Sequence, residues 1–159
     1  MERVRRLYEL PRYQEELKAI ARAEVSREFC GHTLEHFLDV ARLMYIRSLE
    51  EGEIVNREVI YAAALLHDLG RGMQYREGIP HQEAGVLLAR ELLPACRFDE
   101  EEIRQIVSAI GSHRRQQEGQ EPLARYLYQA DKQSRNCFAC PASDRCNWPE
   151  EKKNHGIIR

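Results

Sequence analysis

The sequence lacks the features that mark membrane, secreted and strongly charged proteins. No apolar run reaches the roughly 18 residues that a membrane-spanning helix needs. The basic N-terminal stretch is not followed by the apolar run of a secretory signal. Acidic and basic residues are mixed and the formal net charge is -2, which indicates neither nucleic acid nor an anionic membrane as a partner. We therefore expect a cytoplasmic protein with no nucleic-acid or membrane partner.

Internal repeats, low-complexity tracts and linkers are also missing from the 159 residues. A chain of this length suits one domain, 1–159, which can bury a core without disulfides. No segment shows the sustained alternation of a strand, whereas helical spacing recurs throughout. We predict an all-α protein, a compact bundle of about six helices. The pattern leaves a homo-oligomer open and singles out no interface.

The predicted helices follow from the apolar spacing and from helix-start signals. The first predicted helix begins after Pro11, and the next three cover about 32–49, 56–69 and 81–94. A fifth begins at a capping box of Asp99 and Glu102, and a sixth begins at Pro122. The helix over 56–69 is apolar on almost every side, which is typical of a central, buried helix. We interpret residues 71–80 as a loop near the site that contributes substrate contacts.

Several polar residues fall where the helical spacing predicts core. They are two acids and four histidines: His36, His67, Asp68, His81, His113 and Asp131. A buried carboxylate without a partner costs several kcal/mol, and any one of these residues alone would suit an ordinary hydrogen-bonded core position. Together they predict a site for one or two divalent metal ions, because imidazole and carboxylate ligands suit Fe, Mn, Co, Ni or Zn.

Three segments resemble the HD superfamily of metal-dependent phosphohydrolases: GHTLEHFLDVARLM, AALLHDLGR and QADKQSR. The resemblance covers roughly residues 30–135. It implies an all-helical HD domain in which an early histidine, an adjacent His-Asp pair and a later aspartate bind metal. On this chain those residues are His36, His67, Asp68 and Asp131.

Two further segments, IPHQEAGVLLARELL and AIGSHRR, resemble those of HD subgroups that hold two ions. They would add His81 and His113 to the ligands, with Asp68 bridging the ions. Without a second ion, His81 would be a helix-start residue and His113 a substrate contact. The six-ligand pattern resembles enzymes that split dinucleoside polyphosphates symmetrically, whereas nucleoside monophosphate phosphatases of the family are the four-ligand comparison.

The resemblance implies hydrolysis of a phosphate ester or anhydride in a nucleotide or another small phosphorylated metabolite. A metal ion lowers the pKa of its water enough to give hydroxide near neutral pH, and we expect this water to attack phosphorus. Asp68 or Asp131, whichever is less committed to metal, would orient the water or take its proton. Four basic residues near the ligands are the predicted phosphate contacts: Arg71, Arg114, Lys132 and Arg135.

Two residues beside the ligands have more than one interpretation. Arg71 stands where many members of the family have lysine, and we assign it only a phosphate-clamping role, because arginine is a poor proton donor. His32 lies four residues before His36, on the same face of the predicted helix. It would contact the ligands or the substrate, or be a plain helix-start residue. Each basic residue, taken alone, is equally compatible with a solvated surface charge.

Two other functions use the same ligands. Some two-iron members of the wider fold family activate oxygen instead of water, and the six-ligand set is compatible with such an oxygenase. A non-catalytic sensor module with a structural metal is the third reading. The intact ligand set argues against it, since a degenerate module usually lacks one or more ligands.

The five cysteines include a cluster in the C-terminal extension, 137–146. Cys137, Cys140 and Cys146 form C-x2-C-x5-C, and C-x2-C is a spacing by which two thiolates chelate one metal. The cluster predicts a second metal site, with zinc or an iron–sulfur cluster, or else a set of reduced thiols. The HD pattern does not explain it. A fourth ligand is not evident, and the candidates are Cys30, Cys96 and His155.

Overall fold

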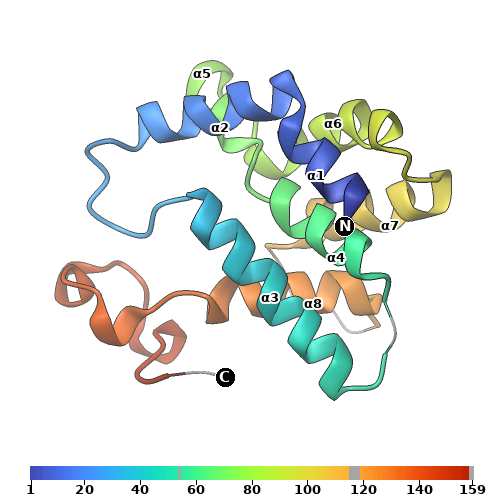
Figure 1. Cartoon of the computed structure of the whole chain (residues 1–159). Coiled ribbons are helices and arrows are strands. Elements are labelled where there is room, and N and C mark those ends of the chain that lie inside the picture. Colours follow the sequence, from blue (N-terminus) through green and yellow to red (C-terminus); the bar gives the residue numbers. More distant parts are fainter. Residues whose placement is uncertain (54, 115–118, 158–159) are drawn as a thin grey trace.

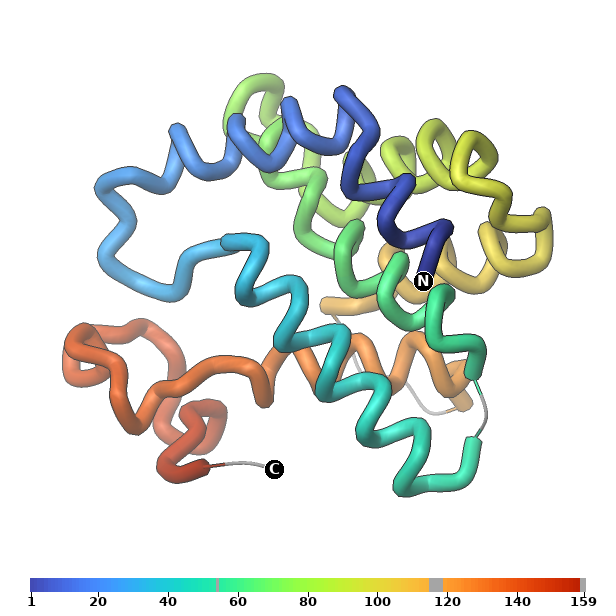
Figure 2. The backbone as a smooth tube through the Cα atoms, in the orientation of Figure 1, coloured from blue at the N-terminus to red at the C-terminus, as the bar shows by residue number. Residues whose placement is uncertain are grey.

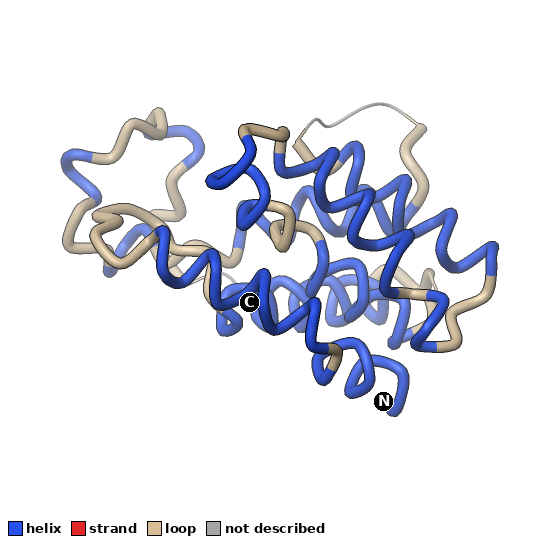
Figure 3. Tube along the Cα trace, turned by 90° about the horizontal axis from the view of Figure 1, so that it is seen from above, coloured by secondary structure: helices blue, strands red, loops and turns tan. Residues whose placement is uncertain are grey.

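The computed structural model describes residues 1–53, 55–114 and 119–157, and every regular element in these ranges is helical (Figures 1 and 3). The α-helices are α1 (Glu2–Glu9), α2 (Pro11–Ala23), α3 (Leu34–Glu50), α4 (Arg57–Leu66), α5 (Arg71–Glu77), α6 (His81–Leu92), α7 (Glu100–Ser112) and α8 (Pro122–Gln133). Short 3-10 turns cover 94–96, 137–139, 143–145 and 150–152. The all-helical prediction is confirmed. No helix in the described ranges combines the length and apolarity that a membrane span requires.

Two of these eight helices, α1 and α5, are absent from the prediction of about six. Helix α1 is mostly charged and buries only Val4 and Leu7, so its apolar stripe is too narrow to recognise in the sequence. Helix α5 occupies most of the predicted loop over 71–80, and that interpretation is wrong for 71–77. It is short and contains Gly72, which has low helix propensity, and it ends at Gly78 in the left-handed conformation.

The predicted starts of the later helices agree with the structure. Asp99 and Glu102 form both hydrogen bonds of a capping box at the start of α7. Pro122 occupies the first turn of α8, and Asn56 caps α4 by accepting a hydrogen bond from the backbone of Glu58. These local signals therefore fix where three core helices begin.

Helix α4 forms the centre of the molecule, and its residues from Val59 to Leu66 are almost all buried. It contacts α1, α3, α6, α7 and α8, and α3 also packs along α8 (Figure 2). Three successive alanines, 62–64, are fully buried on α4. Their small side chains allow neighbouring helices to approach closely, so the end of α4 reaches the middle of the bundle.

Helix α4 ends three residues earlier than predicted, at Leu66 rather than Leu69. A tight turn over 67–70 then leads into α5. A Cβ atom on Gly70 would lie 2.2 Å from the carbonyl oxygen of His81 and 2.5 Å from the backbone nitrogen of Gly85. Only glycine therefore lets this turn lie directly against the start of α6.

The C-terminal segment after α8 has no α-helix in the described residues and runs beside the loop that joins α2 to α3 (Figures 1 and 2). Arg135 donates a hydrogen bond to the carbonyl oxygen of Gly31 at 3.1 Å, and Arg145 forms an ion pair with Glu28. Asn154 donates to three backbone carbonyls at the end of α8, at 2.6 to 3.3 Å. Polar contacts therefore hold much of this segment in place.

Candidate metal centre

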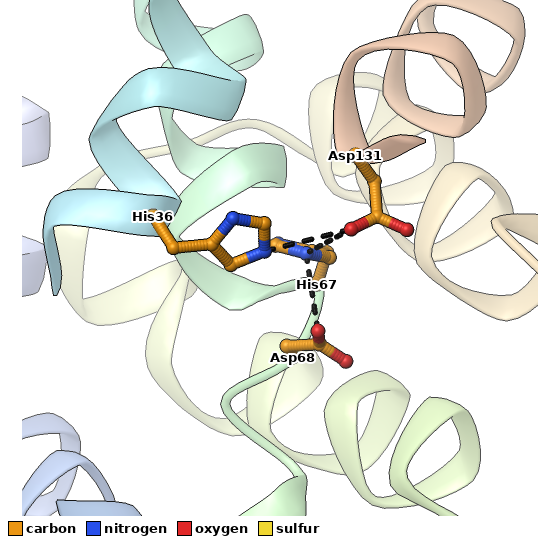
Figure 4. Close-up of side chains that lie close together, drawn as sticks. All are labelled: His36, His67, Asp68 and Asp131. Carbon is orange, nitrogen blue, oxygen red and sulfur yellow. Dashed lines mark ion pairs between the residues drawn. The ribbon is translucent and has the colours of Figure 1, made fainter. Parts of the chain in front are cut away.

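The six predicted metal ligands converge in the interior from the ends and faces of five helices. They are His36 on α3, His67 and Asp68 just after α4, His81 at the start of α6, His113 at the end of α7, and Asp131 on α8. All six side chains are buried. Ligand atoms of four of them, His36, His67, Asp68 and Asp131, lie within 4.8 Å of one another (Figure 4). A second such group consists of Asp68, His81 and His113.

Asp68 belongs to both groups, and its two oxygens face different histidines. Oδ2 lies 3.4 Å from Nε2 of His67, whereas Oδ1 lies 3.4 Å from Nε2 of His81 and 3.9 Å from Nε2 of His113. A carboxylate that bridges two ions presents one oxygen to each. The geometry of Asp68 is therefore the one that a bridging ligand would have.

Asp131 lies across the first group from His36 (Figure 4). Its Oδ1 lies 3.5 Å from Nε2 of His36 and 3.8 Å from Nε2 of His67. Asp131 is buried because it lies on the apolar face of α8, where the sequence spacing predicts it. The three side chains therefore direct their ligand atoms toward one point.

Hydrogen bonds at Nδ1 orient the rings of the four predicted histidine ligands. The Nδ1 atoms of His67 and His113 lie 2.6 Å from the backbone oxygens of Ala64 and Ile110, respectively. Nδ1 of His81 lies 3.0 Å from Oε1 of Gln74, and Nδ1 of His36 lies 3.2 Å from Oγ of Ser134. An Nδ1–H that donates to an oxygen leaves Nε2 with its lone pair directed into the centre. This is the usual arrangement of a metal-binding histidine.

Two polar atoms at the middle of the cluster test whether a metal fits. Nε2 of His67 and Oδ1 of Asp68 are both buried and make no hydrogen bond of good geometry, although Oδ1 forms an ion pair with Nε of Arg71 at 3.0 Å. An unsatisfied buried polar atom costs about 1–3 kcal/mol, and an ion would accept the lone pairs of both. With four imidazoles and two carboxylates around it, the cluster fits a divalent transition metal.

Burial and charge set the protonation of the histidines. Burial lowers the pKa of His36 to about 4 and that of His81 to about 3, so both rings are neutral near pH 7, the form that binds metal. Burial also disfavours a charged His67, but the carboxylates of Asp68 and Asp131 outweigh it and raise its pKa to about 9. The carboxylates thus attract positive charge at the position where an ion would lie.

The four predicted phosphate contacts line one cavity of about 420 Å³ together with four of the six metal-site residues, Asp68, His81, His113 and Asp131. Arg71 lies 3.0 Å from Asp68, and Lys132 lies 2.5 Å from Asp131. Arg135 places Nη2 3.0 Å from Nε2 of His36, and Arg114 is an exposed member of the lining. Arg27, for which the sequence gives no signal, adds a fifth cation to the cavity wall. The cavity therefore combines a metal-binding floor with a cationic rim.

His32 occupies a position that the sequence left open. It is buried, precedes α3 rather than lying on it, and places Nε2 3.6 Å from Oδ2 of Asp68. Its Nδ1 lies 2.5 Å from Oε1 of Glu24, which also accepts a hydrogen bond from the hydroxyl of Tyr75. Glu24 was not predicted, because nothing in the sequence links the end of α2 to the start of α3. His32 therefore contacts the site and is not a plain helix-start residue.

The region predicted as a substrate loop contributes less than expected. Arg71 and Gln74 line the cavity. Arg76 instead pairs with buried Glu16 on α2, with its Nη2 2.7 Å from Oε1. Because residues 71–77 are helical, only one face of the segment is directed toward the site.

The cysteines separate into two environments. Cys30, Cys137, Cys140 and Cys146 line a common cavity beside the site. Cys96 lies instead in the hydrophobic core at the 3-10 turn after α6. His155 is exposed and contacts the backbone of Glu150.

Comparisons with known proteins agree with this architecture. The family model of the HD domain matches residues 33–136. An uncharacterised protein of Clostridium beijerinckii is 44% identical over 141 residues, which cover 89% of this chain and 88% of the relative. The crystal structure of a protein described as a predicted HD superfamily hydrolase, from an uncultured Thermotogales bacterium, matches with a TM-score of 0.59 and 26% identity, over 79% of this chain and 69% of the other.

More distant relatives are much longer proteins. Ribonuclease Y of Latilactobacillus sakei is 32% identical over 97 residues, which cover 61% of this chain but only 17% of the relative. Ribonuclease Y of Sulfurovum is 29% identical over 103 residues, or 65% of this chain and 18% of the relative. The similarity to these proteins is therefore confined to a small part of their length.

Proposed function

The chain belongs to the HD domain family, and we propose that it is a metal-dependent phosphohydrolase acting on a nucleotide or another small phosphorylated metabolite. The family match, the similarity to an HD superfamily hydrolase and the buried His/Asp cluster support a metal-dependent hydrolase in general. The observation that supports a phosphorylated substrate is the set of basic side chains that line the same cavity as that cluster. A phosphoryl group is the substrate chemistry that needs both features at once.

The metal would be held by the six His/Asp residues, with Asp68 shared between two ions. When bound, divalent ions supply Lewis acidity toward phosphoryl oxygens and a water acidic enough to ionise near neutral pH. The chain's own residues do the rest. Asp68 and Asp131 hold carboxylate oxygens 3.4 and 3.8 Å from Nε2 of His67, where either could orient a water or accept its proton.

Substrate charge would be neutralised by the basic side chains around the cavity. Arg71 and Lys132 already contact the two metal-site carboxylates, so they are placed to bind phosphoryl oxygens next to the ions. Arg114 and Arg27 lie farther out on the lining and would bind the remaining phosphates or the leaving group. Phosphoryl transfer requires cations next to the reacting group, whereas an oxygenase would use these cations only for an anionic organic substrate, so the lining favours phosphate over the oxygenase alternative.

His32 is a candidate for holding the reacting water or the substrate. Glu24 holds its Nδ1, which leaves Nε2 facing the cavity next to Asp68. Burial lowers the pKa of His32 to about 4, so the ring is neutral near pH 7 and is a weak base there. We assign it the role of accepting a hydrogen bond at Nε2 and so orienting the water or the substrate.

The shape and lining of the cavity support a nucleotide as the substrate class. Its volume of about 420 Å³ lies within the range of small-molecule sites. Phe29 and Trp148 are part of the lining, and aromatic rings bind bases by stacking. The polar and charged lining otherwise suits sugar and phosphate groups. The ribonuclease Y relatives raise RNA as a competing substrate, which the experiment must include.

Hydrolysis of a panel of compounds, followed by chromatography of the products and by phosphate release, tests the proposal. The panel contains nucleotides, dinucleoside polyphosphates, sugar phosphates and a short RNA, assayed anaerobically with Mn, Fe, Co, Ni or Mg. We expect turnover of a nucleotide or another small phosphorylated compound, lost in Asp68→Ala. Activity on RNA alone, or no turnover from protein shown to hold its metals, would contradict the proposal.

A rim variant sharpens the assay. Arg114→Gln removes a cation without touching a proposed metal ligand, so we expect a higher KM for the phosphorylated substrate and unchanged metal content. Glu100→Gln, on the exposed start of α7, is the control for a charge change elsewhere. An unchanged KM in Arg114→Gln would argue against the role of this residue in substrate binding.

A further inference from the structure

Four cysteines from two distant parts of the sequence meet at one cavity. Cys30 lies in the loop between α2 and α3, and Cys137, Cys140 and Cys146 lie after α8 (Figure 1). They line a space of about 240 Å³. Burial raises the pKa of the Cys30 thiol, and the three C-terminal thiols add to this rise. A fourth thiol thus joins the C-x2-C-x5-C run, and neither Cys96 nor His155 does.

Backbone turns arrange the three C-terminal cysteines. The amide of Cys140 donates to the carbonyl of Cys137, that of Ser143 to Cys140, and that of Cys146 to Ser143, at 3.1 to 3.2 Å. The amide of Trp148 then donates to Sγ of Cys146 at 3.5 Å. Amide hydrogen bonds to sulfur stabilise thiolates that bind metal. Tight turns and one amide that donates to a cysteine sulfur therefore arrange this segment, which in its described residues has no α-helix and no sizeable apolar core of its own.

Two buried cations lie at the same cavity. Arg135 and Lys153 are both in its lining, and their side chains are only 10% and 7% exposed. Lys153 donates to the carbonyl of Ser143 at 2.8 Å, which fixes it between the turns that carry the cysteines. Four thiolates around a dication, or around an iron–sulfur core of that charge, carry a net charge of about -2. Arg135 and Lys153 would offset part of this charge, although each already pairs with a carboxylate, Arg135 with Asp131 and Lys153 with Glu150.

The spacing of the sulfurs separates the metal types. Among the described residues, sets of three or more potential ligands within 4.8 Å of one another occur at the His/Asp centre, and the cysteines form no such set. One tetrahedral zinc with bonds of about 2.3 Å would bring all four sulfurs within about 4 Å of one another. An iron–sulfur core separates its thiolates farther, because several metal atoms lie between them. The wider spacing around an open cavity favours the larger group.

We propose that Cys30, Cys137, Cys140 and Cys146 bind an iron–sulfur cluster beside the His/Asp centre. Binding converts four thiols to thiolates and releases four protons, with one Fe–S bond formed per cysteine. The cluster would form part of the wall of the substrate cavity, since Cys30, Cys137 and Cys146 also line that cavity. This site does not depend on the phosphohydrolase assignment, and the HD family match does not imply it.

The test uses the full chain, purified anaerobically and reconstituted with iron, sulfide and dithiothreitol. We expect a broad visible absorption, an electron paramagnetic resonance signal on reduction, and about four acid-labile sulfides per chain. Sulfide is counted because the His/Asp centre can hold iron but has no place for sulfide. Cys30→Ser, Cys140→Ser and Cys146→Ser should each lose most of this sulfide, while Cys96→Ala should retain it.

Each outcome bears on the proposal. Cys30→Ser is the sharpest variant, because sequence spacing alone does not link it to the other three. Retention of the full cluster in Cys30→Ser would overturn the four-cysteine assignment. One zinc per chain at these cysteines, with no labile sulfide, would overturn the cluster. Circular dichroism of each variant shows whether the helices remain folded, and loss of the cluster with unchanged helicity supports the proposal.

Discussion

The His/Asp centre and the four-cysteine cavity are neighbours that are built in opposite ways. Arg135 and His36 lie at the border between them. The first centre takes its ligands from helices that pack around α4. The second takes them from a loop and from turns that bury little apolar surface of their own. Helix packing can hold ligands without metal, whereas the turns are held by polar contacts and would gain order from a bound metal. The first centre should therefore be preformed, and the second should be coupled to folding.

Removing a ligand from only one of the two groups in the His/Asp centre is the experiment with the largest expected effect. His81→Ala removes a ligand from the group of Asp68, His81 and His113 and leaves the other group intact. We expect about one ion per chain to be lost, activity to fall by about 10²-fold or more, and helicity to stay unchanged. Metal analysis, turnover and circular dichroism measure the three quantities.

Glu83→Ala is the control for His81→Ala, since it changes an exposed residue in the same turn of α6. Full metal content in His81→Ala would show that the second group binds no ion. Unfolding of this variant would show that the centre is not preformed by helix packing, and would break the contrast with the cysteine cavity.

A substitution in the turn before α5 tests whether helix packing positions the proposed metal ligands. In Gly70→Ala the new methyl group would overlap the backbone of α6, so we expect a loss of about 1–3 kcal/mol in the free energy of unfolding. His81 should also move away from Asp68 and weaken binding of one ion. Chemical denaturation and metal titration measure the two effects.

Gly111→Ala is the matched control. The added Cβ would meet Val86 at 3.7 Å, an ordinary contact, within helix α7. Alanine in a helix interior stabilises by about 0.5–1 kcal/mol relative to glycine, so this variant should be as stable as the parent or more so. Equal destabilisation by both substitutions would mean that the close approach at Gly70 has no special importance.

The sequence predicts well that the His/Asp residues are buried together, because these residues follow helical periodicity. His36 and Asp131 stand on apolar faces, and a buried polar residue is conspicuous there. The sequence predicts the wrong position for the end of α4, because alanine and leucine continue the helical pattern up to His67. The turn depends on the contact between Gly70 and α6, which lies outside any local window.

Contacts between loops were beyond the reach of the sequence. Glu24 reaches His32 across the end of α2, and Cys30 reaches the C-terminal turns, without any periodic signal. Spacing identified Cys137, Cys140 and Cys146 as a set but left the fourth ligand among three candidates. Periodicity predicts which face of a helix is buried, whereas loop convergence depends on the assembled fold. The His/Asp centre is therefore easier to predict than the cysteine cavity, because its residues lie on or next to helices, whereas the cysteines lie in loops and turns.

Removal of metal should affect the two regions differently. A strong chelator applied to the holoprotein should make the segment 137–157 at least about tenfold more sensitive to protease, while the helices α3 to α8 stay resistant. Limited proteolysis followed by mass spectrometry locates the cuts. Cys140→Ser should show the same sensitivity before chelation. Early cuts within α3 or α4 would show that the His/Asp centre also depends on its metal for order.

The smallest expected effect concerns the side chains that orient the histidines. For His67 and His113 the acceptor is a backbone oxygen, which no substitution removes, but for His81 it is the side chain of Gln74. Gln74→Ala should weaken binding of one ion by about tenfold, the low end for such partners, because the amide is neutral and partly exposed. Gln74→Glu should keep or tighten metal binding, because a carboxylate at Nδ1 makes the imidazole of His81 more basic and hence a stronger metal ligand. If packing alone orients His81, both variants will bind metal like the parent, and titration of the second ion decides between these outcomes.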